Sequence, residues 1–353
     1  MDRMKGLWDN AWVRLAVGVG VVVILAILPL VLPVFANQTL TRVGVYAVAV
    51  LGLNIIMGYS GQVMLGQIFF LGVGAYVTAY GVVNDANIVV VFLAACIIPG
   101  ILGLIVALAA ARLGGLAIAM VTIALPIIGV PLAKRLSDFT GGSQGISARF
   151  SSAPDWTGLD NDQWQYYVVV FIAAITFVLA YNLVRGRYGR AMAIVRDNES
   201  VARSMGISPY RYKVLAFTIA SVFGGVSGFL YMVAVQYTSP ETLSFHHSIS
   251  LLAAMVVGGA ASIVGSLIGG AYYVLVPQIT NEIDPTITAI SQGIILVAVL
   301  FVLPGGIVSL PRVVRRLVRR RAQAGTPGIQ TTPPPRNAAS TTEGPETERQ
   351  GQA

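Results

Sequence analysis

Long apolar runs separated by short polar segments fill the chain from residue 13 to residue 303. A helix needs about 20 mostly apolar residues to cross a bilayer, so runs of this length are candidate membrane spans. Several runs are shorter, and the regions 63–83 and 249–280 are therefore candidates for re-entrant or broken helices. The pattern predicts an all-α polytopic membrane protein with about ten transmembrane segments, which we draw at residues 13–34, 41–57, 63–83, 88–110, 115–133, 166–184, 213–237, 249–264, 265–280 and 287–303.

Charged residues are few and unevenly placed. They make up 11% of the chain, against about 25% in an ordinary soluble domain, so the composition excludes that class. The 23 Lys and Arg outnumber the 15 Asp and Glu, but they gather at 185–213 and 312–321 beside apolar runs, which argues against nucleic-acid binding. Because cytoplasmic loops carry the excess of Lys and Arg, we expect both clusters and both termini on the cytoplasmic side of the cytoplasmic membrane.

This orientation divides the chain into three parts. We expect a cytoplasmic N-terminus at 1–12, a transmembrane domain at 13–311 and a cytoplasmic tail at 312–353, basic at first and then rich in Pro and Thr, which predicts disorder. The longest external connection is 134–165. It contains polar and glycine residues that form either a flexible turn or a contact for an external binding protein or incoming solute: Thr140, Gly141, Gly142, Ser143, Gln144 and Gly145.

The cytoplasmic loop 185–213 predicts an amphipathic helix over about residues 190–205. One face of this helix carries Ile194, Val201 and Met205, with Ala202 beside them, which is the spacing of an apolar helix face. The helix is either a solvated connector or a docking surface for a cytoplasmic partner.

Local signals fix the end of the expected helix. Glu199 and Arg203 form a favourable pair one turn apart. Gly206 suits the position just past a helix end, and Pro209 prevents continuation.

Two glycine-rich stretches interrupt the apolar runs. The first is Gly58, Tyr59, Ser60, Gly61, Gln62 and Gly66, and the second is Gly258, Gly259 and Gly265. Either they allow close helix contact, or they mark unwound backbone that lines a solute path. Their resemblance to each other is either coincidence or a two-fold internal repeat.

Several kinds of chemistry are missing from the sequence. None of the 15 acidic residues falls inside a drawn span, whereas ion-coupled carriers usually keep an ionisable group at membrane depth. No phosphate-binding G-x-x-x-x-G-K-[ST] loop and no H-E-x-x-H motif occurs, and Cys96 stands alone. We therefore expect no enzyme activity, no metal and no cofactor bound by this chain, so energy for active transport must come from a partner. A passive channel is the alternative.

Five segments, in order, resemble the permease family of branched-chain amino acid ABC importers, and in particular its M-type Liv branch. They are LGLNIIMGYSGQVMLGQIFFLGVGAY (51–76), TGGSQGI (140–146), YGRAMAIVRDNESVARSMGISPYRYKVLAF (188–217), YTSPETLSFHHSISLLAAMVVGGAASIVGSLIGGA (237–271) and LPGGIVSL (303–310). The resemblance covers about residues 40–311.

The resemblance implies a subunit that pairs with a related permease, docks on two cytoplasmic ATP-binding subunits that use the ATP, and receives solute from an external binding protein. In such importers a cytoplasmic loop enters a cleft of the ATPase. Here the corresponding residues are Gly189, Arg190, Ala191, Ile194, Arg196, Asp197, Asn198, Glu199, Ala202, Met205, Gly206 and Ile207. The solutes implied are leucine, isoleucine and valine, while permeases for urea and short amides share the same architecture and are the alternative.

Overall fold

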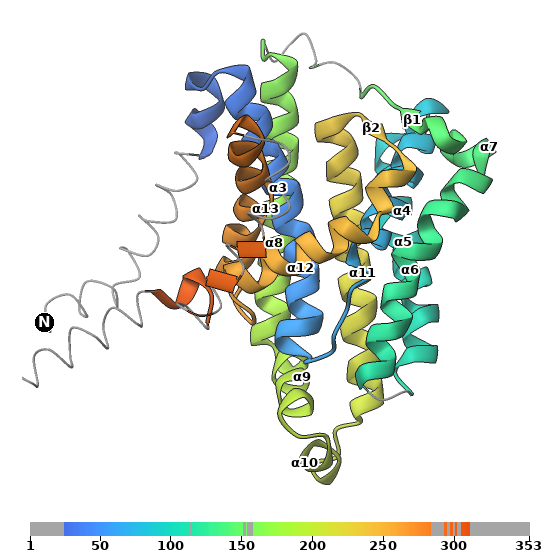
Figure 1. Cartoon of the computed structure of the whole chain (residues 1–353), viewed down its shortest axis with the longest axis vertical. Coiled ribbons are helices and arrows are strands. Elements are labelled where there is room, and N and C mark those ends of the chain that lie inside the picture. The colour runs from blue at the N-terminus through green and yellow to red at the C-terminus, as the bar shows by residue number, and fades with distance from the viewer. Residues whose placement is uncertain are drawn as a thin grey trace, which may run out of the picture. The chain divides into compact units, whose positions relative to one another are not determined.

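The computed structural model describes residues 25–112, 115–150, 153, 158–283, 293–294, 297–298, 301 and 305–310. Figure 1 shows a bundle of helices joined by short connections. Within these residues, six helices are long and apolar enough to cross a membrane, and two apolar helices are shorter. The chain is therefore an all-α polytopic membrane protein, as the apolar pattern predicts. The expected N-terminus at 1–12, the tail at 312–353 and most of the first and last expected spans lie outside the described residues.

The helices follow one another along the chain with two very short strands among them. The elements are α3 (Val34–Asn54), the π-helix η1 (Ile55–Tyr59), α4 (Gln67–Val83), α5 (Ile88–Ala110), α6 (Gly115–Arg135), α7 (Ser137–Thr140), η2 (Gly142–Gln144), β1 (Ile146–Ser147), α8 (Asn161–Arg185), α9 (Arg187–Asp197), α10 (Glu199–Ser204), α11 (Pro209–Val235), β2 (Tyr237–Thr238), η4 (Pro240–Leu243), α12 (Phe245–Gly258), α13 (Ile263–Ile283) and η6 (Ile307–Ser309).

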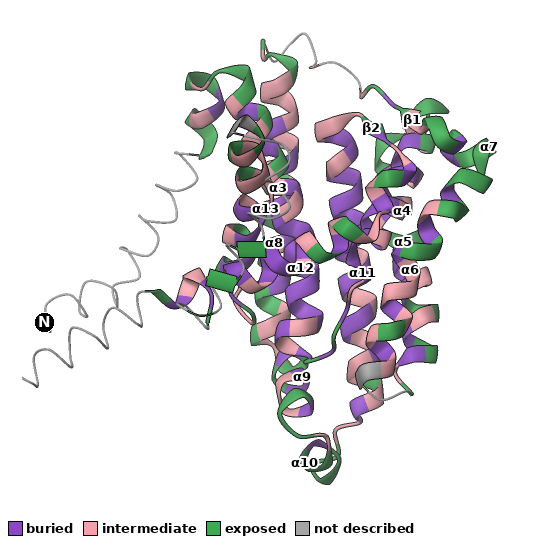
Figure 2. Cartoon of the chain, viewed as in Figure 1, coloured by how far each residue is buried: buried purple, intermediate pink, exposed green. Residues whose placement is uncertain are grey.

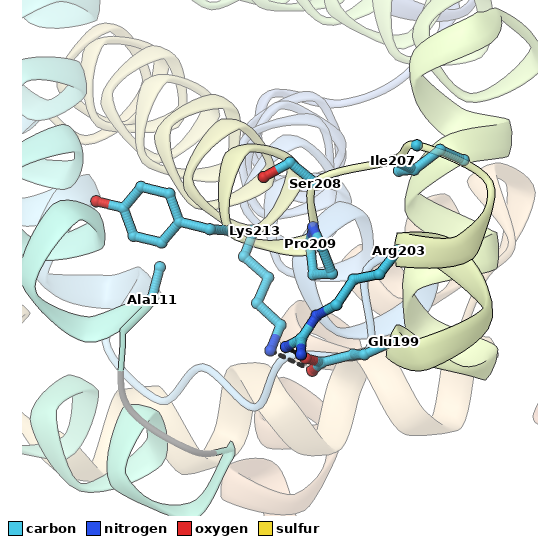
Figure 3. A pocket seen from close by; sticks show the side chains of 9 residues that line it. Ala111, Glu199, Arg203, Ile207, Ser208, Pro209 and Lys213 are labelled. Atoms are coloured by element: carbon cyan, nitrogen blue, oxygen red, sulfur yellow. Dashed lines mark hydrogen bonds and ion pairs between the residues drawn. The ribbon is translucent and has the colours of Figure 1, made fainter.

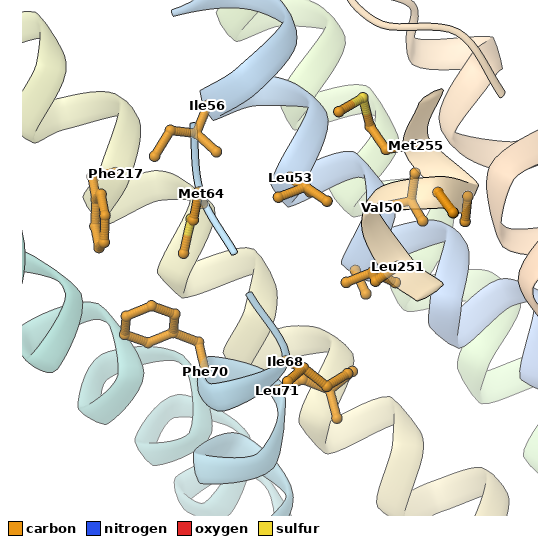
Figure 4. Packing of buried hydrophobic residues seen from close by; sticks show 14 of the residues in the cluster. Val50, Leu53, Ile56, Met64, Ile68, Phe70, Leu71, Phe217, Leu251 and Met255 are labelled. Carbon is orange, nitrogen blue, oxygen red and sulfur yellow. The ribbon is translucent and has the colours of Figure 1, made fainter. Parts of the chain in front are cut away.

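Helices α3 and α11 form the centre of the bundle. The most apolar window of each is 67% buried, against 28% or less for α5, α6, α8 and α13, and Figure 2 shows this contrast between centre and periphery. Helix α11 packs on α3, α4 and α5, while α13 and α8 pack on other sides of α3. In Figure 4 the main apolar cluster joins Leu53 of α3 to Leu251 and Met255 of α12. The outer helices are thus the ones that expose apolar side chains, as contact with lipid requires.

Small residues allow α4 and α11 to approach closely. A Cβ on Gly74 would lie 2.5 Å from the Gly225 carbonyl oxygen, and one on Gly228 would lie 2.1 Å from the Leu71 carbonyl oxygen. Membrane helices commonly use small residues in this way because close backbone contact replaces the hydrophobic driving force that lipid does not supply.

Two expected spans are short or broken, in agreement with the sequence. The backbone after η1 is neither helix nor strand from Gly61 to Gly66, before α4 begins. Helix α12 has 14 residues, so it is about 21 Å long at 1.5 Å per residue, which is less than a bilayer core. Positive φ angles at Gly259 (118°) and Ala261 (57°) turn the chain into α13.

Other expected boundaries are wrong. The division into 249–264 and 265–280 is incorrect because the break falls at residues 259–262. The second span begins at Val34 rather than at residue 41 because Pro33 is the N-cap of α3 and residues 25–31 form the preceding helix. Arg42 is consequently inside α3 and not at its edge.

The two ends of the bundle differ in structure and charge. We call them the α10 end, where α9 and α10 lie, and the strand end, where β1 pairs antiparallel with β2. Helix α6 continues to Arg135 and α8 begins at Asn161 with a capping box at Asp160, so the expected connection 134–165 is too long at both ends. Described basic residues crowd the α10 end (Arg185, Arg187, Arg190, Arg196, Arg203, Arg211, Lys213), whereas the strand end carries Asp85, Asp138, Asp160, Asp162 and Glu241.

Lys134, Arg135 and Arg149 are exceptions to this charge separation, and Lys134 has a partner. Its Nζ lies 3.5 Å from a Glu241 oxygen at the strand end. The pKa of the Glu241 carboxyl is lowered by a hydrogen bond from its own backbone N–H and by the nearby Lys134 ammonium. A basic residue at this end is thus compensated locally.

Candidate coupling and transport site

The loop between α8 and α11 forms two helices instead of the single helix expected at 190–205. Helix α9 ends at Asp197, and Asn198 adopts an extended conformation (φ −161°, ψ 112°). The Asn198 side-chain oxygen then accepts hydrogen bonds from the N–H groups of Ser200 (2.9 Å) and Val201 (3.2 Å). Asparagine is a strong N-cap because its side chain replaces missing backbone partners. The expectation was wrong because this cap starts a new helix.

The break also changes which side chains face outward. Ala202 is fully buried, but Val201 is 49% and Met205 62% exposed, so the expected apolar face with Ile194 does not form. On α9 the buried residues are Gly189, Ala191, Met192 and Val195. Figure 2 shows α10 as an exposed projection of the bundle. The loop therefore presents two apolar side chains to the surroundings at its tip.

Glycine is required at both ends of the loop. A Cβ on Gly189 would lie 2.0 Å from the Val184 carbonyl oxygen, so α9 can lie against the end of α8 only if this position has no side chain. Gly206 follows α10 with φ of 75°, the left-handed conformation that favours glycine after a helix. Its expected place past the helix end is confirmed, and Pro209 begins α11.

Glu199 ties α10 to the start of α11. Its carboxylate pairs with Lys213, and its second oxygen lies 3.6 Å from Arg203, which confirms the expected pair. The Lys213 side chain is only 14% exposed. Figure 3 shows these three side chains converging at the wall of an open pocket of about 450 Å³, which is also lined by Ala111, Gly206, Ile207, Ser208, Pro209 and Tyr210.

The same loop contacts the first glycine-rich stretch. An Arg196 guanidinium nitrogen donates a hydrogen bond of 2.6 Å to the Gly58 carbonyl oxygen. Gly61 has φ of 72°, and a Cβ there would lie 2.4 Å from Arg196 Cγ. The Gln62 amide nitrogen donates to the Lys213 carbonyl oxygen over 3.1 Å. The irregular segment before α4 is thus held by α9 and by the first turns of α11.

The two glycine-rich stretches meet at Asn54, a residue that the sequence reading missed. The Asn54 amide nitrogen donates to the carbonyl oxygens of Gly259 (3.3 Å) and Ser262 (2.8 Å) and to the Ser266 hydroxyl (3.1 Å). Its oxygen accepts from the Ala261 N–H over 2.7 Å. The sequence does contain a signal for this role, since Asn54 is an amide side chain within an apolar run, and a buried amide needs hydrogen-bond partners.

Close backbone packing surrounds Asn54. A Cβ on Gly58 would lie 2.4 Å from the Ala261 nitrogen, and one on Gly258 would lie 2.1 Å from the Gly265 carbonyl oxygen. A Cβ on Gly66 would lie 2.8 Å from the carbonyl oxygen of Thr122 in α6. These glycines permit helix contact, whereas a solute path along them stays a prediction.

At the strand end, residues 140–145 form an ordered turn. The Thr140 hydroxyl donates to the Leu136 carbonyl oxygen (2.8 Å) and accepts from the Gly142 N–H (3.2 Å). Positive φ angles occur at Gly141, Gly142 and Gly145. Ser143 and Gln144 are exposed, so they are the residues of this turn that a partner could reach.

No arrangement suited to a metal is found in the described ranges, since no group of three or more His, Cys, Asp or Glu gathers there. The loop of α9 and α10 instead has the features of a mechanical contact: an exposed apolar tip and charged groups that link its base to two spans.

Comparison with known proteins gives one matching family and several relatives. Residues 35–303 match the family described as "Branched-chain amino acid transport system / permease component". The high-affinity branched-chain amino acid transport system permease protein LivM of Escherichia coli (strain K12) is 31% identical over 252 residues, which are 64% of this chain and 58% of that protein. LivM of Salmonella typhimurium is 26% identical over 300 residues, 77% of this chain and 69% of that protein.

A more distant relative is the nucleoside ABC transporter permease protein NupC of Lactococcus lactis, 34% identical over 90 residues, 25% of this chain and 28% of that protein. No solved structure gives a significant match. The family match covers well over half of the sequence. The chain belongs to the branched-chain amino acid transport system permease family.

Proposed function

We propose that this chain is the membrane-spanning permease subunit of an ATP-driven importer for leucine, isoleucine and valine. Its partners are a second, related permease, two cytoplasmic ATP-binding subunits that supply the energy, and an external solute-binding protein. The similar LivM proteins are named as permeases of high-affinity branched-chain amino acid transport. In this proposal the α10 end is cytoplasmic, in line with its excess of basic residues.

The observation that carries the proposal is the double attachment of the α9–α10 loop. Its exposed tip at Val201 and Met205 is available to an ATP-binding subunit. Its base is attached through Arg196 to Gly58 and through Glu199 to Lys213. Motion imposed on the tip would therefore reach the irregular segment at 60–66.

From there the motion has a route to the second interrupted region. The Ser60–Gly66 segment follows η1, and Asn54, one turn earlier, holds the turn between α12 and α13. Irregular backbone at membrane depth is tolerated where it lies against protein or a water-filled space. A solute path beside these two turns would open or close as they shift.

Charge exchange at Glu199 and Lys213 tests the coupling. Glu199→Lys and Lys213→Glu each place two like charges side by side. Because position 213 is largely buried, this repulsion is weakly screened, and we expect leucine uptake to fall by about tenfold or more. The double variant restores the pair in reverse, and uptake should return to within about twofold of wild type. Uptake is measured in cells that contain the complete transporter, with equal amounts of permease in the membrane.

Full uptake by either single variant would contradict the coupling role. A double variant as inactive as the single ones would show that Glu199 acts outside this pair, which would contradict the attachment through Lys213.

Two further measurements separate the alternatives of solute and mechanism. Unlabelled leucine, but not urea, should compete with labelled leucine for uptake by the complete transporter. The purified chain in liposomes should show no solute flux without its ATP-binding partners. Competition by urea would favour an amide permease, and flux through the chain alone would favour a channel.

A further inference from the structure

Arg42 lies deeper in a membrane span than its sequence context suggests. Because α3 begins at Val34, Arg42 is in the third turn, about 12 Å from the start of the helix at 1.5 Å per residue. A charged side chain at such depth is unfavourable in lipid and usually faces a protein interior or water, where it serves a function.

The neighbours of α3 show which way Arg42 points. Gly44 packs on α8, the Val45 carbonyl oxygen accepts a hydrogen bond from Ser227 of α11, and Ala47 packs on α13. Successive residues of a helix are about 100° apart, at 3.6 residues per turn. Arg42 and Tyr46 therefore project between α11 and α13, on the side of α3 away from α8.

That side of α3 leads to α12. One and two turns beyond Tyr46, Ala49 and Leu53 join the apolar cluster that includes Leu251 and Ala254 of α12. In Figure 1, α12 crosses the bundle in front of α3, between α11 and α13. Arg42 is thus on the strand-end side of the α12 contact.

Polar side chains from four helices form a connected row that begins at Tyr46, one helical turn from Arg42. The Tyr46 ring centroid is 4.1 Å from that of Tyr273 and 6.4 Å from that of Tyr231. The Tyr273 hydroxyl and His247 Nδ1 are 2.9 Å apart. The Arg42 guanidinium is near enough to interact electrostatically with Tyr46 and Tyr231. We call these five residues the Arg42 cluster.

The guanidinium lacks a protein partner in the described part of the chain. No hydrogen bond or ion pair there involves Arg42, and its side chain is exposed. A guanidinium forms short, paired hydrogen bonds with a carboxylate, and tyrosine hydroxyls can donate to the same group. Convergent polar groups in an otherwise apolar setting are typical of a small-molecule site.

We propose that the Arg42 cluster binds the α-carboxylate of an amino acid solute as it passes through the permease. This proposal rests on the proposed importer function and adds a chemical requirement to it: the solute must carry an anionic group. A neutral solute such as urea gains nothing from the charge of Arg42.

The test compares leucine with leucinamide, which keeps the side chain and the ammonium group but lacks the carboxylate. Uptake of each is measured in proteoliposomes that contain the complete transporter, for wild type, Arg42→Gln and Arg42→Lys. Arg149→Gln removes an exposed charge elsewhere at the strand end and is the matched control. For each variant, the ratio of leucine uptake to leucinamide uptake is divided by the same ratio for wild type. This division removes the preference of the binding protein, because the same binding protein delivers both solutes in every sample.

We expect Arg42→Gln to lower this ratio about tenfold, since it loses one charge-assisted pair. Arg42→Lys should lower it less, and Arg149→Gln should leave it unchanged. An unchanged ratio in Arg42→Gln overturns the proposal, even if uptake of both solutes stays at the wild-type level. The same holds if uptake of both solutes falls equally, which is the result expected if Arg42 pairs with lipid or with the sister permease. If wild type imports no leucine while ATP is hydrolysed, the proposed function itself fails, and this assignment fails with it.

Discussion

At the scale of single residues, Asn54 connects segments that are far apart in the described part of the chain. It makes four hydrogen bonds to residues 259–266 across more than 200 positions of sequence. Its side chain is 1% exposed, so water cannot replace these partners. The turn between α12 and α13 thus depends on one amide group.

Replacing Asn54 with leucine should lower the free energy of unfolding by about 3 kcal/mol, because buried N–H and C=O groups lose their partners. The measurement is the thermal unfolding midpoint of the purified protein in detergent. Asn84→Leu is the matched control, since Asn84 is exposed and bonds only within its own helix end. Equal midpoints for the two variants would be inconsistent with the role of Asn54.

At the scale of elements, the α9–α10 loop depends on the break at Asn198. The residues around the break could all continue a helix. Instead, the Asn198 side-chain oxygen accepts hydrogen bonds from the N–H groups of Ser200 and Val201. In a continuous helix these N–H groups would donate to backbone carbonyl oxygens. The break turns Val201 and Met205 outward. It therefore creates the exposed tip on which the proposed docking depends.

Asn198→Ala should destabilise α10 by about 1 kcal/mol, the usual effect of losing an N-cap. Hydrogen exchange at the Ser200 and Val201 amides should then be about fivefold faster than in wild type. Asn198→Asp keeps a capping oxygen and should exchange at nearly the wild-type rate. Identical exchange in the alanine variant would mean that the cap does not hold α10.

The sequence predicted the parts of this site that depend on local chemistry. Glu199 with Arg203, Gly206 after the helix and the glycine interruptions at both stretches all follow from neighbouring residues. The sequence did not reveal contacts between distant segments, such as Asn54 with Ala261 or Arg196 with Gly58. Periodicity carries no information on which distant segments meet.

Boundary errors had a different physical cause. Apolar composition alone does not show where a helix begins or ends, so the cap at Pro33 was missed, and the boundary between two spans was drawn after residue 264 instead of at 259–262. The depth of Arg42 was misjudged for the same reason. Nearly two extra turns of α3 before residue 41 place this charge inside the span.

At the scale of the molecule, the account depends on the two ends of the bundle facing opposite compartments. Basic residues dominate the α10 end, and acidic residues are frequent at the strand end. In the proposed orientation, which follows the positive-inside rule, α10 lies in the cytoplasm, where ATP-binding subunits could reach it. The turn at residues 140–145 would then face outward, toward the proposed solute-binding protein.

Cysteine labelling tests this arrangement most directly. In a Cys96→Ser background, Ser204→Cys places a thiol on α10 and Ser143→Cys places one in the strand-end turn, both at exposed positions. A membrane-impermeant maleimide added to intact cells should label the Ser143→Cys variant and should label the Ser204→Cys variant only after the membrane is opened. Labelling of the Ser204→Cys variant in intact cells would place the α9–α10 loop outside, away from ATP, and would contradict the proposed coupling.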